Sequence, residues 1–448
     1  MGDDIRICII GHFLVDVTFG GVKEEPKLRF GGIAHAARAA WALGIPYTLA
    51  YFAPEYLDEQ IQLFSLNYGK AMAKKIGNVI GCPNVVTIGE PTEVGSPRYQ
   101  FLLRDEQRSN IYEETLSDVC KQKDVTDFLI FPGGFDLEKI LNALKASHAG
   151  VHVDANFKPD YPKEFESLGR KIDTIIYSTS SEIFMHLYES SVSKLCDSLL
   201  GTYTDAVLFK ENRGGSRFFS VKNSNSPFFI PAQTRKIKHS VGVGDCFDAA
   251  YIICRRKMAE KTALTYASCI AAEYACTTYP DDFANATRAT MQISKEEIIQ
   301  ISGVSLPWER RPDCEIYIAA PDFKNVDCEP IEQLDQCLKY HNFSPRRPVK
   351  ENGEIGIHAS EQQRQALCDA DVHLMEHCQI MVAVLLYNDP GTLIEMGMAY
   401  QMRMPLIVYD PYCLASNLIL TQLPNLISPN MDEVISAVFK YAAREFRS

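Results

Sequence analysis

The stretch HSVGVGDCFDAAYI, residues 239–252, places a glycine turn directly before an apolar helix. Gly242 and Gly244 bracket the turn, with Val243 between them, and the apolar run begins at once. Backbone N–H groups at such a helix start lack partners inside the helix, and the helix dipole adds positive potential there. The stretch therefore predicts a site for a small anion at the amino end of a helix.

Strand and helix patterns alternate through the chain before and around this stretch. A glycine turn leads into an Ala-rich helix at 31–44, and a helix begins at about residue 244. Short apolar runs typical of buried strands occupy residues 5–11, 47–53, 127–134, 150–156, 174–182 and 206–210. This alternation predicts a mostly parallel, doubly wound α/β sheet, in which ligands gather at the carboxyl ends of the strands. Residues 97–113 alternate polar and apolar side chains instead, and we expect them to form strands of a small β lid.

A second, smaller α/β domain is expected after a boundary at 304–314, which contains two prolines and several charges without a helical period. We therefore assign residues 1–303 to the first domain, 304–314 to a linker and 315–448 to the second domain. The second domain has strand patterns at 315–323, 379–386 and 405–410, helix patterns at 328–341, 360–377 and 391–403, and a polar loop at 344–355. We expect a Rossmann-like or flavodoxin-like fold for it.

The composition excludes several classes of protein. Of the 448 residues, 46% are hydrophobic and 23% are charged, which rules out collagen-like, low-complexity and wholly disordered chains. No run of apolar residues is long enough for a membrane span. The net charge is −12 and neither part of the chain is basic, so we expect no nucleic acid partner and no membrane partner. The fourteen cysteines include no C-x-x-C pair, and the N-terminus lacks the order of a signal peptide, so we expect a cytoplasmic protein with reduced thiols.

Asp245 follows the glycine turn and falls in the first turn of the expected helix. A carboxylate there could accept the proton of an alcohol that attacks a γ-phosphoryl group, while the backbone amides hold the developing charge. The alternative is a glycine turn in which Asp245 only stabilises the helix dipole. Spacing alone leaves both interpretations open.

The stretch GVGDCFDAAY resembles the G-A-G-D-x-F-x-A-G motif of the ribokinase-like (PfkB-type) carbohydrate and nucleoside kinases. Over about residues 5–300, other pieces of that family's pattern follow in its order, among them Asp16 after the first strand and DANFK at 154–158. The resemblance implies ATP-dependent phosphorylation of a sugar or nucleoside hydroxyl, with Asp245 as the base. It implies Mg²⁺ that arrives with ATP rather than on direct protein ligands.

The same resemblance implies roles for further residues. Those expected to bind the acceptor substrate are Asp16, Gly31, Gly32 and His35, and those expected to bind ATP or its phosphates are Gly242, Val243, Gly244, Glu182, Lys210 and Gly214. The chain also departs from the family. His239, Ser240 and Val241 replace the usual Asp-Thr before the glycines, and His35 stands where the family has a substrate-binding asparagine. The identity of the acceptor is therefore left open by the sequence.

The second domain carries YNDPGTLIEMGMAY at 387–400, where a Pro-Gly turn precedes a helix. Asp389 lies just before the helix and Glu395 about one turn inside it, so the two carboxylates could converge on one pocket at a strand end. Paired carboxylates suit cleavage at an anomeric carbon. The alternative is an acidic helix N-terminus in which Asp389 or Thr392 acts as the cap.

This stretch resembles the D-x-G-T-x-x-E-x-G-x-A signature of the nucleoside 2-deoxyribosyltransferases, and the likeness spans about residues 315–445. The resemblance implies that Glu395 attacks C1′ of a nucleoside and that a second base, or water, resolves the intermediate. Asp371 would exchange a proton with the leaving base, and the residues implied in substrate binding are Asp389, Tyr317, Asn417, Gly391 and Thr392. Asn417 would reach a neighbouring protomer's site, which implies a homo-oligomer. No cofactor is implied for this domain.

Three interpretations follow. The first is a bifunctional nucleoside-salvage enzyme, whose second domain cleaves or exchanges N-glycosidic bonds and whose first domain phosphorylates a sugar or nucleoside, so that nucleosides, nucleobases and sugars are its partners. The second is a glycosyl transferase or hydrolase, acting on nucleosides or their monophosphates, with a degenerate kinase fold as scaffold or nucleotide sensor. Two arginines in SPRRP, 344–348, could bind the phosphate of a monophosphate. The plainer interpretation of this segment is a solvated basic loop. The third is a non-catalytic nucleotide-sensing protein.

Overall fold

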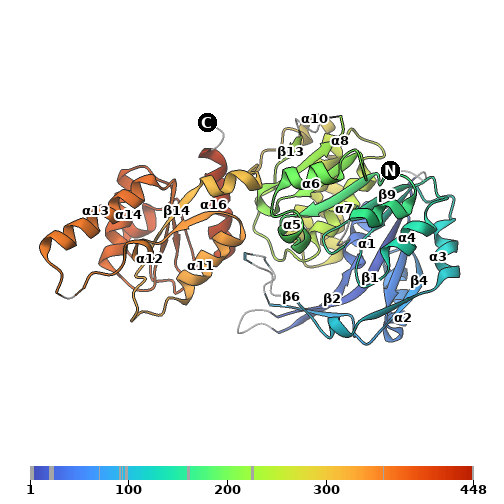
Figure 1. The fold of residues 1–448 in the computed structure, drawn as a ribbon, viewed down its shortest axis with the longest axis horizontal. Coiled ribbons are helices and arrows are strands. Elements are labelled where there is room, and N and C mark those ends of the chain that lie inside the picture. The colour runs from blue at the N-terminus through green and yellow to red at the C-terminus, as the bar shows by residue number, and fades with distance from the viewer. Residues whose placement is uncertain are drawn as a thin grey trace. The chain divides into compact units, whose positions relative to one another are not determined.

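The computed structural model describes residues 5–19, 25–69, 71–89, 92, 94–95, 99–158, 162–222, 227–356 and 358–445. The chain divides into two compact units, one of Met1–Glu93 and Pro97–Ser305, the other of Val94–Ser96 and Leu306–Ser448. Each unit has its own sheet (Figure 1). The assignment of 304–314 as a linker stays a prediction. This segment contains a 3-10 helix, Trp308–Asp313, in which Trp308 and Arg311 are buried.

The sheet of the first unit runs in the order β13-β12-β11-β10-β9-β8-β1-β3-β4-β7. The strands from β11 to β4 in this order are parallel, whereas β12, β13 and β7 are antiparallel edges. The bounds of these strands are β1 Ile7–Thr18, β3 Tyr47–Ala53, β4 Ala71–Ile80, β7 Arg108–Ile111, β8 Asp127–Ile130, β9 Gly150–Asp154, β10 Thr174–Ser178, β11 Ala206–Lys210, β12 Ser216–Ser220 and β13 Phe228–Ile230. The predicted strands of the first domain are therefore present, with ends that differ by a few residues.

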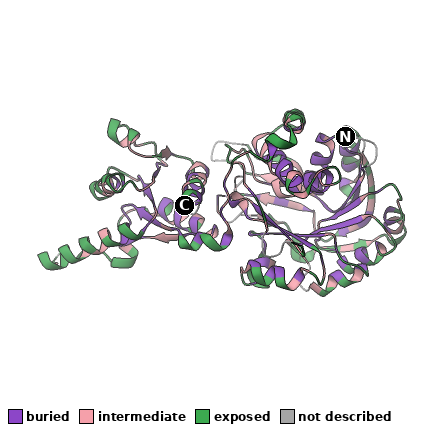
Figure 2. Ribbon diagram, turned by 90° about the horizontal axis from the view of Figure 1, so that it is seen from above, coloured by how far each residue is buried: buried purple, intermediate pink, exposed green. Residues whose placement is uncertain are grey.

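Both faces of this sheet are covered. Along β1, Ile7 and Ile9 join a core with the helices α1, α7 and α8, while the alternate residues Cys8 and Ile10 are also fully buried. Because successive side chains of a strand point to opposite faces, neither face of the inner half of β1 meets solvent. The helices of this unit are α1 Ile33–Ala42, α2 Asp58–Asn67, α3 Glu113–Cys120, α4 Leu137–Ala143, α5 Glu182–His186, α6 Val192–Leu199, α7 Val243–Cys254, α8 Glu260–Cys276, α9 Pro280–Gln292 and α10 Lys295–Ile298. The predicted doubly wound α/β sheet is confirmed, and its central strands β3, β8, β9 and β10 are buried throughout (Figure 2).

A small β layer extends from the same sheet, but its composition differs from the prediction. The outer half of β1 pairs with β2, Lys27–Gly32, and with β5, Val85–Ile88. The segment 97–113 contributes β6, Tyr99–Phe101, and β7, which do not pair with each other: β6 pairs with β5, and β7 pairs with β4. The first strand was predicted to stop at residue 11, whereas it continues to Thr18 and so carries Asp16 out of the main sheet. Gly11 and His12 interrupt the apolar residues of this segment, which is why the predicted strand ended there. Pairing of residues 13–18 with β2 keeps the strand extended beyond this point.

The sheet of the second unit is parallel throughout, in the order β15-β14-β16-β17-β18. Its strands are β14 Glu315–Ala319, β15 Ser344–Arg346, β16 Ile380–Val384, β17 Leu406–Tyr409 and β18 Leu426–Ser428, and its helices are α11 Glu329–Tyr340, α12 Pro348–Asn352, α13 Glu361–His377, α14 Pro390–Gln401, α15 Leu418–Gln422 and α16 Met431–Glu445. The small α/β fold is confirmed. The polar loop predicted at 344–355 is wrong, because β15 and α12 form there. A three-residue strand is too short to show a period, and Pro348 opens α12 at its first turn.

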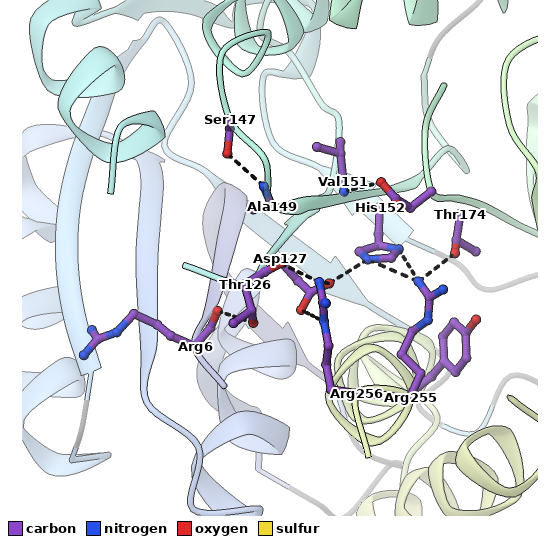
Figure 3. A network of polar contacts seen from close by, with 12 residues as sticks. Arg6, Thr126, Asp127, Ser147, Ala149, Val151, His152, Thr174, Arg255 and Arg256 are labelled. Carbon is purple, nitrogen blue, oxygen red and sulfur yellow. Dashed lines mark hydrogen bonds and ion pairs between the residues drawn. The ribbon is translucent and has the colours of Figure 1, made fainter. Parts of the chain in front are cut away.

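A buried charged network lies at the amino-terminal edge of the first sheet (Figure 3). Asp127, the first residue of β8, accepts two hydrogen bonds of 2.6 Å from the Arg256 guanidinium and one of 3.1 Å from His152 Nε2. Asp127 is 1% exposed. Burial alone would raise the pKa of Asp127, but the bonds from His152 and Arg256 outweigh it and lower the pKa from 3.8 to about 2. The network ties the segment that follows α7 to β8 and β9, at the edge opposite the carboxyl ends of the strands.

We expect Asp127→Asn to destabilise the first unit by about 2–4 kcal/mol at pH 7, because it leaves the buried His152 and the partly exposed Arg256 without their anion. The pKa of Asp127 is lower in the folded state than its ordinary 3.8, so its stabilisation is present above that pH and is lost as the pH falls toward 2. Urea unfolding should therefore show a difference from wild type that shrinks between pH 4 and pH 2. Asp124→Asn is the matched control, since its 2.9 Å ion pair with Arg6 is exposed and its loss should cost under about 1 kcal/mol. Equal losses for both variants would contradict this account.

Among the residues that the structure describes, no helix is both long and apolar enough to cross a membrane. All fourteen cysteines are free, and eight of them are buried.

Candidate active sites

The anion cradle predicted at 239–252 forms at the amino end of α7. Gly242 is the N-cap and has a left-handed backbone with φ of 73°. A Cβ on Gly242 would lie 2.0 Å from Cγ of His35, so both the backbone and the space require glycine there. A Cβ on Gly244 would lie 3.3 Å from Nζ of Lys210. The two glycines therefore let a histidine and a lysine approach the first turn of α7 closely.

Asp245 lies in this first turn, three residues after the N-cap Gly242. Burial raises the pKa of Asp245 from 3.8 to about 7, and the carboxylates of Asp154 and Asp16 raise it further while Lys210 opposes them. A carboxyl group with a pKa near neutrality can both lose and accept a proton at physiological pH.

Asp16 and His35, two of the predicted acceptor-binding residues, contact each other. His35 Nε2 lies 2.9 Å from Oδ2 of Asp16, and His35 Nδ1 lies 2.7 Å from the Tyr274 hydroxyl. Burial lowers the pKa of His35 to about 4 despite the bond to Asp16, so the ring is neutral. Both ring nitrogens of His35 thus have partners within the protein. An acceptor substrate that binds His35 would have to compete with these partners.

Gly31 and Gly32 make room for this contact. A Cβ on Gly31 would lie 2.0 Å from Oδ1 of Asp16, and Gly32 caps α1 with φ of 58°. The structure therefore brings Gly31, Asp16 and His35 together beside Gly242, as the sequence predicted for residues of one site.

Two residues of this neighbourhood were not predicted as site residues. Arg29 donates to the carbonyl oxygen of Val241 at 2.9 Å and contacts the His239 ring at 3.3 Å, and Tyr274 meets His35. Arg29 comes from β2 and Tyr274 from α8, more than 240 residues apart in the chain. Neither lies in a motif, so the sequence carried no pattern that could have found them.

The residues predicted on the nucleotide side follow the carboxyl ends of neighbouring strands. Lys210 ends β11, and its Nζ lies 2.9 Å from Oδ2 of Asp154 and 2.8 Å from Oδ2 of Asp248. Gly214 is buried in a 3-10 turn after β11, where its N–H donates to the carbonyl oxygen of Glu211 at 2.9 Å. Glu182 is exposed at the start of α5, after β10. Their roles in binding ATP stay predictions.

In the second unit, Glu395 and Tyr317 form the centre predicted from the sequence. The Tyr317 hydroxyl on β14 donates to Oε1 of Glu395 on α14 at 2.7 Å. Burial raises the pKa of Glu395 from 4.5 to about 7, the bond from Tyr317 lowers it, and the carboxylates of Asp371 and Asp389 raise it. Burial, together with Glu395, also raises the pKa of Tyr317 well above its usual value, so that tyrosine stays a donor. The result is a carboxylate that is partly ionised at neutral pH and held in one orientation.

Asp389 caps α14, as the plainer interpretation of the sequence required. Its Oδ2 accepts from the backbone N–H of Thr392 at 2.7 Å and from the Thr392 hydroxyl at 2.9 Å. A Cβ on Gly391 would lie 3.1 Å from the same oxygen. Because Asp389 also raises the pKa of Glu395, it is close enough to act on the same group. Asp389 can therefore cap α14 and also bind substrate. Its role in substrate binding stays a prediction.

Asp371 lies on α13, where its Oδ1 accepts from Nδ2 of Asn352 at 2.8 Å. Asn352, the last residue of α12, was not predicted, because the sequence analysis expected a loop there. Asp371 raises the pKa of both Glu395 and Tyr317. Residues of the helices α12, α13 and α14 and of the strand β14 therefore form one group of interacting side chains. Asn417 is exposed and caps α15 by accepting from the N–H of Ile419 at 2.9 Å. Its reach into a neighbouring protomer stays a prediction.

The two arginines of 344–348 are paired within the protein. Arg347 is 7% exposed, and its guanidinium lies 2.7 Å from Asp322 and 2.8 Å from Glu332. Arg346 pairs with Glu351 at 2.6 Å and with Glu315 at 2.8 Å. The interpretation of this segment as a solvated basic loop is wrong, and a phosphate would have to displace carboxylates to bind either arginine. In the described part of the chain, no group of three or more His, Cys, Asp or Glu residues could hold a metal ion.

Comparison with known proteins supports both units. A model of the nucleoside 2-deoxyribosyltransferase family matches residues 316–417. A search of the curated proteins finds no match. Among solved structures, the ligand-free form of a protein described as ribokinase II from Escherichia coli is 16% identical, covers 64% of this chain and 99% of its own, and has a TM-score of 0.51.

Two further structures cover the same part of the chain. The E. coli protein in complex with ATP and Mg²⁺ is 16% identical over 64% of this chain and 99% of its own, with a TM-score of 0.48. Arabidopsis thaliana ribokinase, complexed with ribose and ATP, is 15% identical over 65% of this chain and 100% of its own, with a TM-score of 0.45. The fold of the first unit is ribokinase-like, and residues 316–417 of the second unit match the model of the nucleoside 2-deoxyribosyltransferase family, as the sequence predicted.

Proposed function

We propose that this protein, with its ribokinase-like fold and its nucleoside 2-deoxyribosyltransferase domain, is a bifunctional nucleoside-salvage enzyme of the cytoplasm. The second unit would cleave or exchange the N-glycosidic bond of a nucleoside. The first unit would transfer phosphate from ATP to a sugar or nucleoside hydroxyl. The observation that supports this most strongly is the Glu395 carboxylate, bonded by Tyr317 inside the segment that matches the transferase family.

In the proposed transfer, an oxygen of Glu395 attacks C1′ and the bond from C1′ to the base nitrogen breaks. The electron pair of that bond leaves with the base, which takes up a proton that Asp371 can supply. A glycosyl–Glu395 ester remains. A second base or water then attacks C1′, its proton passes to Asp371, and the bond from C1′ to the Glu395 oxygen breaks to free the carboxylate. Tyr317 orients Glu395 throughout, and Asp389 is placed to bind sugar hydroxyls.

A direct test mixes a deoxynucleoside with a different free base and follows the new nucleoside by chromatography. A new nucleoside supports transfer, and free base with free sugar supports hydrolysis. If neither forms with any pairing of natural nucleosides and bases, the proposal for the second unit is wrong.

Tyr317→Phe should change the pH profile of this reaction. The variant removes the only hydrogen bond to Glu395 seen in the described residues, and that bond lowers the pKa of Glu395. Because attack requires the ionised carboxylate, the acid limb, expected near pH 7 in the wild type, should move upward by about one unit. The rate should fall about tenfold at pH 6.5 and much less at pH 9. A uniform loss at every pH would show that Tyr317 acts by packing alone.

In the first unit, Asp245 would take the proton of an acceptor hydroxyl while the cradle of Gly242, Val243 and Gly244 holds phosphate oxygens. Asp16 would bind the acceptor. Mg²⁺ would arrive with ATP and supply positive charge to the phosphates. The fit rests on the start of α7, which Gly242 caps with a left-handed backbone, and on the near-neutral pKa of Asp245.

A second candidate for the first unit is a nucleotide-binding scaffold without kinase activity. It is favoured by the contacts of His35, whose two ring nitrogens bind Asp16 and Tyr274. Incubation with Mg-ATP and a panel of sugars and nucleosides, followed by assay of ADP, separates the two. ATP binding without any stimulated ADP release would favour the scaffold.

A further inference from the structure

Two histidines share one exposed side of α13, the helix labelled in Figure 1. His373 and His377 lie four residues apart in the last two turns of this helix, and both are exposed. Residues with this spacing are neighbours on a helix surface. Their rings stack, with centroids 4.3 Å apart and an angle of 20° between the ring planes. Two imidazoles with this spacing on one side of a helix can bind one metal ion together.

A backbone contact determines which nitrogen of His377 is available to a ligand. Nδ1 of His377 lies 2.7 Å from the backbone carbonyl oxygen of His373. A carbonyl oxygen can only accept a hydrogen bond, so Nδ1 carries the proton and Nε2 of the neutral ring presents a lone pair. Histidines that bind metals are commonly oriented in this way, by an N–H donated to a backbone carbonyl. His377 is thus held in a tautomer that suits a metal ligand.

The surroundings of the two histidines favour a cation. The helix ends at His377, and the carboxyl end of a helix carries partial negative charge. Asp369, four residues before His373, and Glu376, three residues after it, are exposed acidic neighbours on the helix surface. Asp371 lies about 200° around the helix from His373, because each residue turns an α-helix by about 100°. The two histidines therefore face away from the candidate active site of the second unit.

The sequence of this helix end also matches a known order of metal ligands. Residues 373–377 read HLMEH, which is the H-x-x-E-H order of one class of zinc enzymes. Catalytic zinc sites have three protein ligands. Within the described ranges of the chain, no set of three His, Cys, Asp or Glu residues is arranged to hold a metal. The geometry therefore supports binding of an ion by two side chains, and we infer no catalytic step at this site.

We propose that His373 and His377 bind one divalent transition-metal ion, such as Zn²⁺, Ni²⁺ or Cu²⁺, through imidazole nitrogens, with water in the remaining coordination positions. Imidazole suits these ions, whereas Mg²⁺ prefers oxygen ligands. A bound ion would join the last two turns of α13 and so restrain the end of the helix that carries Asp371. This inference does not depend on the proposed activity of either unit. The competing account is a stacked surface pair that binds no ion.

Binding of Ni²⁺ to the untagged full chain, measured by calorimetry, distinguishes the two accounts. For His373→Ala and for His377→Ala we expect Ni²⁺ binding at this site to weaken at least about tenfold, because each variant removes one of two ligands. His186→Ala is the matched control, since His186 is exposed in the last turn of α5 and has no histidine four residues away. Its Ni²⁺ binding should stay within about twofold of wild type. Binding of Ni²⁺ by thiols is common to all variants and cancels in the comparison.

Hydrogen exchange, followed by mass spectrometry, gives a second measurement. Ni²⁺ should slow the exchange of backbone amides in the last two turns of α13 in the wild type but not in His377→Ala, and Mg²⁺ at the same concentration should slow it in neither. Circular dichroism confirms folding of each variant. If the wild type binds no Ni²⁺ at up to about 1 mM, the inference is overturned. Equal Ni²⁺ binding by the wild type and by both α13 variants would overturn it as well.

Discussion

Glu395→Ala is expected to reduce the exchange of bases between deoxynucleosides by at least about 10³-fold, because it removes the proposed nucleophile. Without the carboxylate, no covalent intermediate can form, and Tyr317 loses the group that it orients. The measurement is the initial rate of new nucleoside formation. In a second measurement, mass spectrometry of the wild-type protein incubated with a nucleoside and no acceptor should show a sugar adduct that the variant lacks.

Glu395→Gln sharpens this test, since glutamine keeps the size of the side chain and its bond from Tyr317. It should be as inactive as the alanine variant. It should also unfold at a higher temperature than wild type at pH 8, because burial penalises the ionised Glu395 whose pKa lies near 7. Glu361→Ala, an exposed acidic residue at the start of α13, serves as a control and should leave the rate unchanged. Wild-type rates in Glu395→Gln would rule out this residue as the nucleophile.

The second large effect is expected for Asp245→Asn. Phosphoryl transfer to any acceptor found for the wild type should fall by about 10²–10⁴-fold, the contribution of a general base. ADP release in the presence of that acceptor is the measurement. Mg-ATP binding should persist, because the backbone amides of the cradle are unchanged.

Stability separates this role from that of a helix-stabilising aspartate. The pKa of Asp245 is raised to about 7 in the fold, so its ionised form destabilises the protein as the pH rises through 7. Asp245→Asn should therefore raise the melting temperature at pH 8. Asp281→Asn, an exposed aspartate in the first turn of α9, should instead lower it slightly. A lowered melting temperature for Asp245→Asn, with unchanged ADP release, would make Asp245 a structural residue.

The alternation of short apolar runs with helical patterns determined both folds. Strands such as 47–53 and 206–210 have the bounds read from the sequence, because runs of β-branched, aromatic and apolar residues buried on both faces leave few alternatives. The signatures around Asp245 and Glu395 also identified the two helix N-termini correctly, since glycine before an apolar helix constrains the backbone locally. The error fell on 344–355, where elements of three and five residues are too short to show a period. The strands expected within 97–113 are present as β6 and β7, but the sequence did not predict which strands they pair with.

The sequence by itself thus determined the two folds and the acidic residues at the start of α7 and α14. Only the tertiary structure decided which groups face those residues. Tyr317 lies 2.7 Å from Glu395 across 78 residues of chain, and Lys210 joins Asp154 to Asp248. A pKa depends on charges and burial within a few ångströms, and those distances are set by packing between elements distant in the chain. Local patterns carry the backbone of a site, whereas its protonation states belong to the fold.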